Sequence, residues 1–173
     1  MSRHSKPVIG ISRCLLGENV RYDGGNTFQE NLKEMIGDTF ELFGVCPEVE
    51  MGLGIPRETI QLVKIEEQVH LMNSARNRDL TNLAQETFKK FNLGICDGFI
   101  LQSRSPSCGF KTTKLYQRDS QGEENLISEE SSGVFTNFLQ ESFPEIPLLD
   151  SSELQAKVDD FLLKVKNHHK KRP

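Results

Sequence analysis

The 173-residue sequence lacks the features that would assign it to a membrane, to secretion or to general nucleic-acid binding. No apolar run approaches the roughly 20 residues that a membrane-spanning helix needs. No hydrophobic stretch of targeting length follows the first methionine. Neither sign of charge dominates, since the formal net charge is -4, whereas a nucleic-acid-binding domain shows a basic face. These absences predict a cytoplasmic protein with no membrane partner.

Cysteine is also scarce, and the four cysteines are widely and irregularly spaced. This spacing does not resemble the disulfide framework of a small secreted domain. Thiols stay reduced in the cytoplasm, so we expect these side chains to serve in ligation or chemistry.

Basic residues gather only at the end of the chain, from His168 to Arg172. Such a tail could contact RNA phosphates. Chain ends are commonly solvated and frayed, and this second interpretation is the one that we favour.

Glycine and proline divide the chain into alternating strand-like and helix-like segments. Apolar runs predict buried strands at 7–12, 40–45, 98–103 and 146–149. Apolar residues at helical spacing predict helices at 26–36, 79–91, 133–143 and 154–165. This alternation is typical of an α/β protein with a parallel sheet.

The middle of the chain adds a smaller element and a polar segment. Alternating apolar residues at 60–66 and 68–73 predict a hairpin. Residues 118–132 are polar and partly acidic, which predicts a mobile loop able to cover a crevice as a lid. We therefore expect one domain over residues 1–173, with a Rossmann-like three-layer fold, a mostly parallel sheet and a small hairpin.

Three of the four cysteines follow predicted strands at the point where each strand ends. These are Cys14, Cys46 and Cys108, whereas Cys96 precedes its strand. Parallel sheets gather functional residues in the crevice at the carboxyl ends of their strands. We therefore expect the first three thiols to meet in one cavity and Cys96 to lie at the opposite end of the sheet.

Three thiolates leave one coordination position of a metal centre open, whereas four would close it. Two alternatives remain. The cysteines could be buried as small apolar residues, or they could hold zinc together with a water molecule. The glycines and prolines around the three cysteines favour a functional site over simple packing.

Polar residues beside two of these cysteines suit catalysis. Glu48 follows Cys46 after a proline that stiffens the turn, and a carboxylate near a metal centre can orient or deprotonate water. Ser105 and Ser107 precede Cys108. Their hydroxyl groups can donate to the sulfides of an iron–sulfur cluster, if the cysteines hold one, or to a substrate heteroatom. An exposed loop glutamate is the alternative for Glu48. A nucleophilic serine is not expected, because no histidine lies in a motif that supplies its base.

Two further loops carry candidate substrate-binding residues. Arg21 and Asp23 lie beside two glycines in the first loop, where they can recognise a polar, planar substrate. An ion pair that holds the loop is the alternative. Arg57 ends a Gly-Leu-Gly-Ile-Pro-Arg segment that lacks the pattern of a phosphate loop, and we include it as a candidate site residue.

Five short segments occur together and in order along the chain. They are CLLG from Cys14, RYDG from Arg21, CPE from Cys46, GIPR from Gly54 and SPSCG from Ser105. This combination resembles the thiouracil desulfidase (TudS) family, formerly a domain of unknown function. The resemblance covers almost the whole chain.

The resemblance implies that Cys14, Cys46 and Cys108 hold a [4Fe–4S] cluster by three of its irons, with one iron open. It also implies that Glu48 and Ser105 are the catalytic carboxylate and serine. The expected activity is a non-redox removal of sulfur, released as hydrogen sulfide, from thiolated uracil, a nucleoside or tRNA thiouridine. The alternative function is an iron–sulfur binding or sensor protein without turnover. We expect substrate contacts from Arg21, Asp23, Arg57 and Ser107.

The sequence also departs from the family pattern. Val20 stands where many members have an additional cysteine, so this loop offers no fourth protein ligand. Segments 20–25, 52–63 and 133–147 look closest to the catalytic domain of two-domain relatives that act on 4-thiouridine in tRNA. The sequence does not contain their second domain, which makes a free thiolated base or nucleoside the more plausible substrate and leaves tRNA open.

Overall fold

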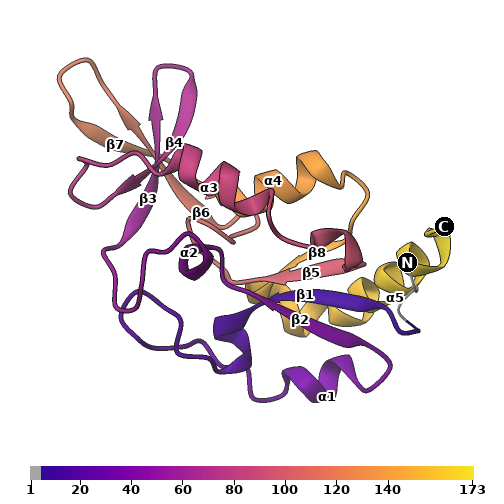
Figure 1. The fold of residues 1–173 in the computed structure, drawn as a ribbon. Helices are drawn as coiled ribbons and strands as arrows, with labels where there is room; N and C mark the ends of the chain where they lie inside the picture. The colour runs from indigo at the N-terminus through magenta and orange to yellow at the C-terminus, as the bar shows by residue number, and fades with distance from the viewer. Residues whose placement is uncertain (1–4) are drawn as a thin grey trace.

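The computed structural model describes residues 5–173 and is built around a parallel four-stranded sheet (Figure 1). Its strand order is β2–β1–β5–β8, and all three neighbouring pairs are parallel. The strands are β1 (Val8–Ser12), β2 (Glu41–Val45), β5 (Gly98–Leu101) and β8 (Leu148–Asp150). The predicted α/β class and parallel sheet are therefore confirmed.

Helices cover both faces of this sheet and give the three predicted layers (Figure 1). One face is covered by α3 (Thr81–Phe88) and α4 (Val134–Ser142). The other is covered by α1 (Leu32–Ile36) and α5 (Leu154–Lys171). No helix in the described part of the chain is long and apolar enough to span a membrane.

Strand β1 is buried on both of its faces, which explains the apolar run in its sequence. Val8 packs into the apolar cluster below α3 and α4, whereas Ile9 and Ile11 pack against α1 and α5. Successive side chains in a strand point to opposite faces. Since both faces of β1 are covered, all five of its residues are buried.

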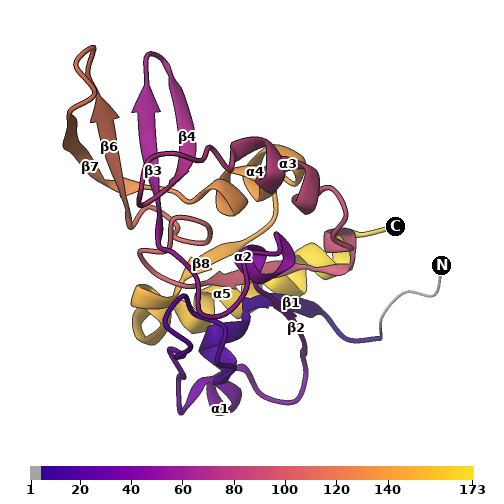
Figure 2. The same ribbon diagram turned by 60° about the vertical axis from the view of Figure 1, so that its left-hand side comes forward.

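A second sheet, in the order β4–β3–β6–β7, stands beside the first. Strands β3 (Ile60–Ile65) and β4 (Gln68–Asn73) form the predicted hairpin. Strand β6 (Thr113–Arg118) lies parallel to β3 and pairs antiparallel with β7 (Glu124–Ser131). Figure 2 shows the two hairpins projecting side by side from the body of the protein.

The prediction of a mobile loop over residues 118–132 was wrong, because most of this segment is β7. Strand β7 lies at the edge of its sheet, and none of its residues is buried. An exposed edge strand can be largely polar, without a buried face, and still pair with its neighbour.

The helix predicted over 26–36 was also wrong in its first half, since α1 begins only at Leu32. The preceding residues run alongside the short 3-10 helix η1 (Arg13–Leu16). There the amides of Thr27 and Gln29 donate to carbonyls of η1, at 3.0 and 3.2 Å. These hydrogen bonds between distant segments replace the intrahelical ones and bring Thr27 next to Cys14.

The basic end of the chain is ordered, so the interpretation as a frayed tail was wrong. Helix α5 continues to Lys171, and its end packs on the fully buried carboxylate of Asp97. Nitrogen atoms of His168, His169 and Arg172 lie 3.2, 2.9 and 2.9 Å from the Asp97 oxygens. The backbone amide of Val8 adds a fourth contact at 3.0 Å.

Candidate functional site

A cavity of about 640 Å³ opens beyond the carboxyl ends of β1, β2 and β5. In the order β2–β1–β5–β8 the chain reverses its direction of winding between β1 and β5, which is where open α/β sheets bind ligands. Residues of β3 and β6 line the far side of the cavity. The site therefore lies between the parallel sheet and the second sheet.

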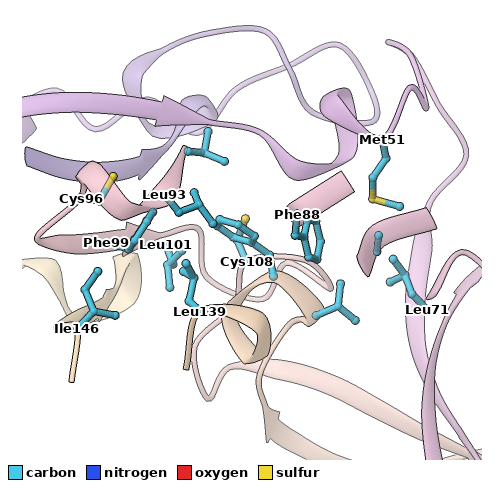
Figure 3. Close-up of a cluster of buried hydrophobic side chains, with 14 of the residues drawn as sticks. Met51, Leu71, Phe88, Leu93, Cys96, Phe99, Leu101, Cys108, Leu139 and Ile146 are labelled. Carbon is cyan, nitrogen blue, oxygen red and sulfur yellow. The ribbon is translucent and has the colours of Figure 1, made fainter. Parts of the chain in front are cut away.

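The three cysteines expected to converge, Cys14, Cys46 and Cys108, all line this cavity. They arrive from both sides of the parallel sheet, since Cys108 belongs to the apolar cluster below α3 and α4 and the other two to the opposite cluster. Cys96 is buried and does not line the cavity. Figure 3 shows Cys96 and Cys108 in separate parts of the same apolar cluster.

The sulfur atoms lie close enough to affect one another's ionisation. Burial raises the pKa of all three thiols. For Cys108, the neighbouring Cys14 and Cys46 add to this rise, and Cys14 adds to the rise for Cys46. Ionised together, three adjacent thiolates would repel one another, and a bound metal centre would remove that cost.

The chemistry of these donors fits an iron–sulfur cluster, which cysteine thiolates hold through separate irons. Within residues 5–173, no three His, Cys, Asp or Glu side chains are close enough together to hold one metal ion. The zinc alternative requires its ligands to meet at a single ion. A cluster does not, because each of its irons binds its own cysteine.

Glu48 lies in the short helix α2 (Pro47–Glu50), which begins directly after Cys46. Both oxygens of its carboxylate accept hydrogen bonds. Arg57 Nε donates to Oε1 at 3.2 Å, and Ser107 Oγ donates to Oε2 at 3.3 Å. The other guanidinium nitrogens of Arg57 donate to backbone carbonyls. The Arg57 side chain is thus nearly buried and engaged with its own chain, although Arg57 also lines the cavity, and its substrate contact stays a prediction.

Ser105 and Ser107 play different parts in the loop that carries Cys108. Ser105 lines the cavity, and its hydroxyl oxygen accepts from the amides of Ser107 and Cys108, at 3.2 and 3.0 Å. Ser107 is fully buried and does not line the cavity. The structure therefore places the Ser107 hydroxyl against Glu48 and outside the cavity lining, and a substrate contact of Ser107 stays a prediction.

The start of α4 holds this loop in place. The amides of Val134 and Phe135, which have no partner within the helix, donate to the carbonyls of Pro106 and Ser107 at 3.0 and 2.9 Å. A Cβ at Gly133 would lie 2.3 Å from the Ser107 backbone. Only glycine allows this approach of loop and helix.

The first loop contributes Arg21 to the cavity but not Asp23. The Asp23 carboxylate accepts from the amide of Gly25 at 2.9 Å and so stabilises the turn from within. The structure gives Asp23 a structural contact where the sequence predicted a substrate contact.

Six cationic side chains line the cavity, against two carboxylates. Within the described chain, Arg21, Arg104 and Lys111 form no ion pair with a carboxylate. Arg104 and Lys111 also have φ values of 63° and 58°, a left-handed conformation that costs free energy and recurs at functional sites. The cavity therefore presents excess positive charge to a ligand. The six cations are Arg13, Arg21, Arg57, Arg104, Lys111 and Lys114.

The 2-thiouracil desulfurase family model matches residues 9–151, a stretch that runs from β1 to the end of β8 and includes all three cavity cysteines. The chain belongs to this family. The family expected from the five sequence segments is thereby confirmed.

Two individual proteins are similar to this desulfurase-family chain. The solved structure of a [4Fe–4S]-dependent thiouracil desulfidase, TudS, matches with a TM-score of 0.64 and 25% identity, covering 91% of this chain and 99% of that one. An uncharacterised protein of Bacillus subtilis (strain 168), YbbK, is 28% identical over 114 residues, which are 59% of this chain and 73% of that protein.

The structure shows a residue that supports this desulfurase-family site from outside the cavity lining and that the sequence analysis missed. Asp150 ends β8 and is buried. Its Oδ2 accepts from the amide of Phe110 at 3.0 Å and from the Thr112 hydroxyl at 2.9 Å. Thr112 in turn accepts from the amide of Arg104. An aspartate directly after a buried strand was the available signal, since it marks the carboxyl end of the sheet.

Proposed function

We propose that this protein is a non-redox desulfidase that removes the thiocarbonyl sulfur from a thiolated pyrimidine. Family membership and the similarity to a thiouracil desulfidase support this function. The observation that carries it is the meeting of three cysteines with Glu48 and Ser105 around one cavity. The cytoplasm, which keeps thiols reduced, is the compartment that we propose.

Cys14, Cys46 and Cys108 would hold a [4Fe–4S] cluster and leave one iron without a protein ligand. When bound, the cluster would supply a Lewis-acidic iron for the sulfur of the substrate. The buried thiols and their mutual effect on pKa support this assignment.

The reaction exchanges sulfur for the oxygen of water. A C–O bond forms, the C–S bond breaks, and the products are the carbonyl compound and hydrogen sulfide, with no net change in oxidation state. Glu48 would accept a proton from the attacking water. Arg57 and Ser107 would hold the Glu48 carboxylate in a fixed orientation, because each donates to one of its two oxygens.

Ser105 would act as a hydrogen-bond donor to the substrate. Its oxygen already accepts from two backbone amides. Because a hydroxyl has one proton and two acceptor positions, the proton of Ser105 remains for a heteroatom of the pyrimidine ring. This contact would stabilise negative charge that develops as water attacks.

The proposed substrate is a thiolated pyrimidine nucleoside that carries a phosphate, either free or within RNA. The cavity volume of about 640 Å³ falls in the range of about 300–1,000 Å³ that accommodates drug-sized ligands. Arg21, Arg104 and Lys111 supply positive charge without a carboxylate partner. Phosphate oxygens are suitable partners for such side chains.

The test uses protein reconstituted with iron and sulfide under anaerobic conditions. Loss of thiocarbonyl absorbance and release of sulfide are measured with 2-thiouracil, 4-thiouracil, 4-thiouridine and 4-thiouridine 5′-monophosphate. Glu48→Gln should retain iron and lose activity by about 10²–10⁴-fold. A failure to convert any of the four compounds would reject the desulfidase function and favour the cluster-binding or sensor alternative.

The phosphate preference has its own control. Arg104→Ala should raise KM for the monophosphate and leave KM for 4-thiouridine nearly unchanged. Lys164→Ala removes an exposed lysine of α5 that pairs with Asp160, and should change neither. Equal kcat/KM for the nucleoside and its phosphate would reject the substrate class and leave the desulfidase function intact.

A further inference from the structure

We propose that Tyr22 is a specificity-determining residue of the cavity, on whose side chain the pyrimidine ring of the substrate stacks. The inference rests on the proposed function, because it concerns the ring that carries the thiocarbonyl group. The contacts proposed above serve the reacting group and a phosphate, whereas Tyr22 binds the flat face of the ring between them.

Aromatic side chains are scarce at the cavity, although the chain has many of them. The sequence contains 11 phenylalanines, two tyrosines and no tryptophan. Among residues 5–173, no phenylalanine lines the cavity, whereas both tyrosines, Tyr22 and Tyr116, do. Tyrosine combines a flat apolar ring with a polar end, which suits a partly solvated site. The two tyrosines are therefore the candidates for contact with a planar ring.

Tyr22 is the more accessible of the two. It is 40% exposed, whereas Tyr116 lies in β6 opposite the fully buried Val63 of β3 and is itself half-buried. The guanidinium carbon of Arg21 lies 5.8 Å from the centroid of the Tyr22 ring, which is within the range of a cation–π contact. A cation over one face of a ring leaves the opposite face for a ligand.

Arg57 fixes the position of Tyr22 relative to Glu48. The backbone amide of Arg57 donates to the Tyr22 carbonyl at 2.8 Å, and its guanidinium donates to the Val20 carbonyl at 2.8 Å. The same guanidinium donates to the Glu48 carboxylate at 3.2 Å. One residue thus holds both the loop that carries the aromatic ring and the carboxylate proposed to activate water. A pyrimidine stacked on Tyr22 is therefore held at a defined position relative to Glu48.

The loop around Tyr22 is also closed by its own hydrogen bonds. The Arg21 amide donates to the Gly25 carbonyl at 3.2 Å, and the Gly24 amide donates to the Arg21 carbonyl at 3.0 Å. With the backbone fixed, a tyrosine has only two side-chain torsions left to order when a ligand binds. Stacking recognises the flat face that every nucleobase has, so Tyr22 selects for a planar ring.

The test measures the binding of two ligands to the reconstituted holoprotein by isothermal titration calorimetry. Uridine 5′-monophosphate is the product expected from 4-thiouridine 5′-monophosphate and carries the ring, whereas ribose 5-phosphate has only the sugar and the phosphate. Tyr22→Leu should raise the Kd for the nucleotide by about tenfold and leave the Kd for ribose 5-phosphate unchanged. Tyr22→Phe retains an aromatic ring and should retain the wild-type Kd for the nucleotide.

A matched control replaces another exposed aromatic ring with leucine. Phe28 is 56% exposed and does not line the cavity. Phe28→Leu should therefore change neither Kd.

Tyrosine fluorescence supplies a second measurement, which a purely structural role of Tyr22 would not affect. Because the chain has no tryptophan and two tyrosines, Tyr116→Phe leaves Tyr22 as its one strong fluorophore. Uridine 5′-monophosphate should then lower the emission of the holoprotein as its ring stacks on Tyr22, after correction for the absorbance of the ligand. Ribose 5-phosphate should leave the emission unchanged.

The inference is overturned if Tyr22→Leu binds the nucleotide as tightly as the wild type, or if it weakens the binding of both ligands equally. Either result, in a protein that converts a thiolated pyrimidine, leaves the proposed function intact. Binding of the nucleotide that depends on Tyr22, in a protein that converts none of the four thiolated compounds, supports the inference and rejects the desulfidase function.

Discussion

The two ends of the parallel sheet use the same residue types in opposite ways. At the carboxyl end, Cys46 and Glu48 face a cavity. At the amino end, Cys96 and Asp97 are buried, and Asp97 is surrounded by the end of α5. A cysteine next to an acidic residue therefore carries no function by itself. The difference is that the surrounding chain leaves Cys46 and Glu48 beside a cavity that a ligand can enter, whereas it encloses Cys96 and Asp97.

The two ends of the sheet also differ in whether their thiols are isolated or grouped. Burial, with a further contribution from Asp97, raises the pKa of Cys96 to about 12. Burial also raises the pKa of Cys14, Cys46 and Cys108, and that of Cys108 lies well above its usual value. These three thiols line one cavity, where they can share one positively charged centre. A neutral, isolated thiol is inert, whereas three clustered thiols favour a metal centre.

The largest difference between the two ends is expected when their cysteines are substituted. Cys108→Ser should lose most of the iron bound after anaerobic reconstitution, because serine is a poor substitute for a thiolate ligand. Cys96→Ala should retain the full iron content and cost only about 1 kcal/mol of stability. Iron and sulfide analysis of the two variants measures the difference. Equal iron contents would contradict the assignment of the two ends.

The second effect is confined to stability. Asp97→Ala leaves Arg172 and the two histidines without their carboxylate, and should lower the free energy of unfolding by about 3 kcal/mol. Asp160→Ala removes an exposed carboxylate that pairs with Lys164 on α5, and should cost under about 1 kcal/mol. Urea unfolding of both variants at pH 7 gives the values. A loss of iron binding in Asp97→Ala with unchanged stability would show that this end also serves the site.

A smaller effect is expected where helix and loop meet at the carboxyl end. Gly133→Ala places a methyl group 2.3 Å from the Ser107 backbone, and should cost about 1–3 kcal/mol through overpacking while displacing the Cys108 loop. Gly94→Ala is the matched control, because a Cβ there meets no atom within 4 Å. Unfolding and iron retention are compared for the two. If both variants behave alike, the close contact is not needed.

The smallest effect is a pH dependence at the amino end. Burial acts to raise the pKa of Asp97, but hydrogen bonds from Val8, Arg172 and the two histidines outweigh it, so the pKa lies below its usual value. A carboxyl whose pKa is lowered on folding stabilises the protein above its unfolded pKa of about 3.9. This contribution is lost as pH falls through the folded value.

The measurement compares wild type with Asp97→Ala from pH 7 to pH 3. The stability difference between them should be constant at neutral pH and shrink as the acid range is entered. A difference that stays the same down to pH 3 would show that the carboxylate does not contribute through its charge.

The elements that the sequence predicted correctly are those with a strong local pattern. The run from Val8 to Ser12 is apolar on both faces and could only be a buried strand. The alternating segments of β3 and β4 likewise predicted their hairpin. Residues 26–31 were predicted wrongly because they pair with η1, which lies earlier in the chain and leaves no signal in the local pattern. Residues 118–132 were predicted wrongly for another reason: β7 pairs with the adjacent β6, but it is an exposed edge strand without the apolar alternation that marks a half-buried strand.

For the site, the sequence determined which residue types follow each strand, and the parallel sheet required them to converge. That was enough to place Cys14, Cys46 and Cys108 around one cavity. Only the tertiary structure decided that Arg57 and Ser107 hold Glu48, and that Asp150 holds the loop of Cys108. The ends of strands can be predicted from the sequence because the pattern of apolar residues along the chain shows where a buried strand stops. The partner of a side chain depends on which atoms folding brings together, and the sequence alone does not show where that side chain points.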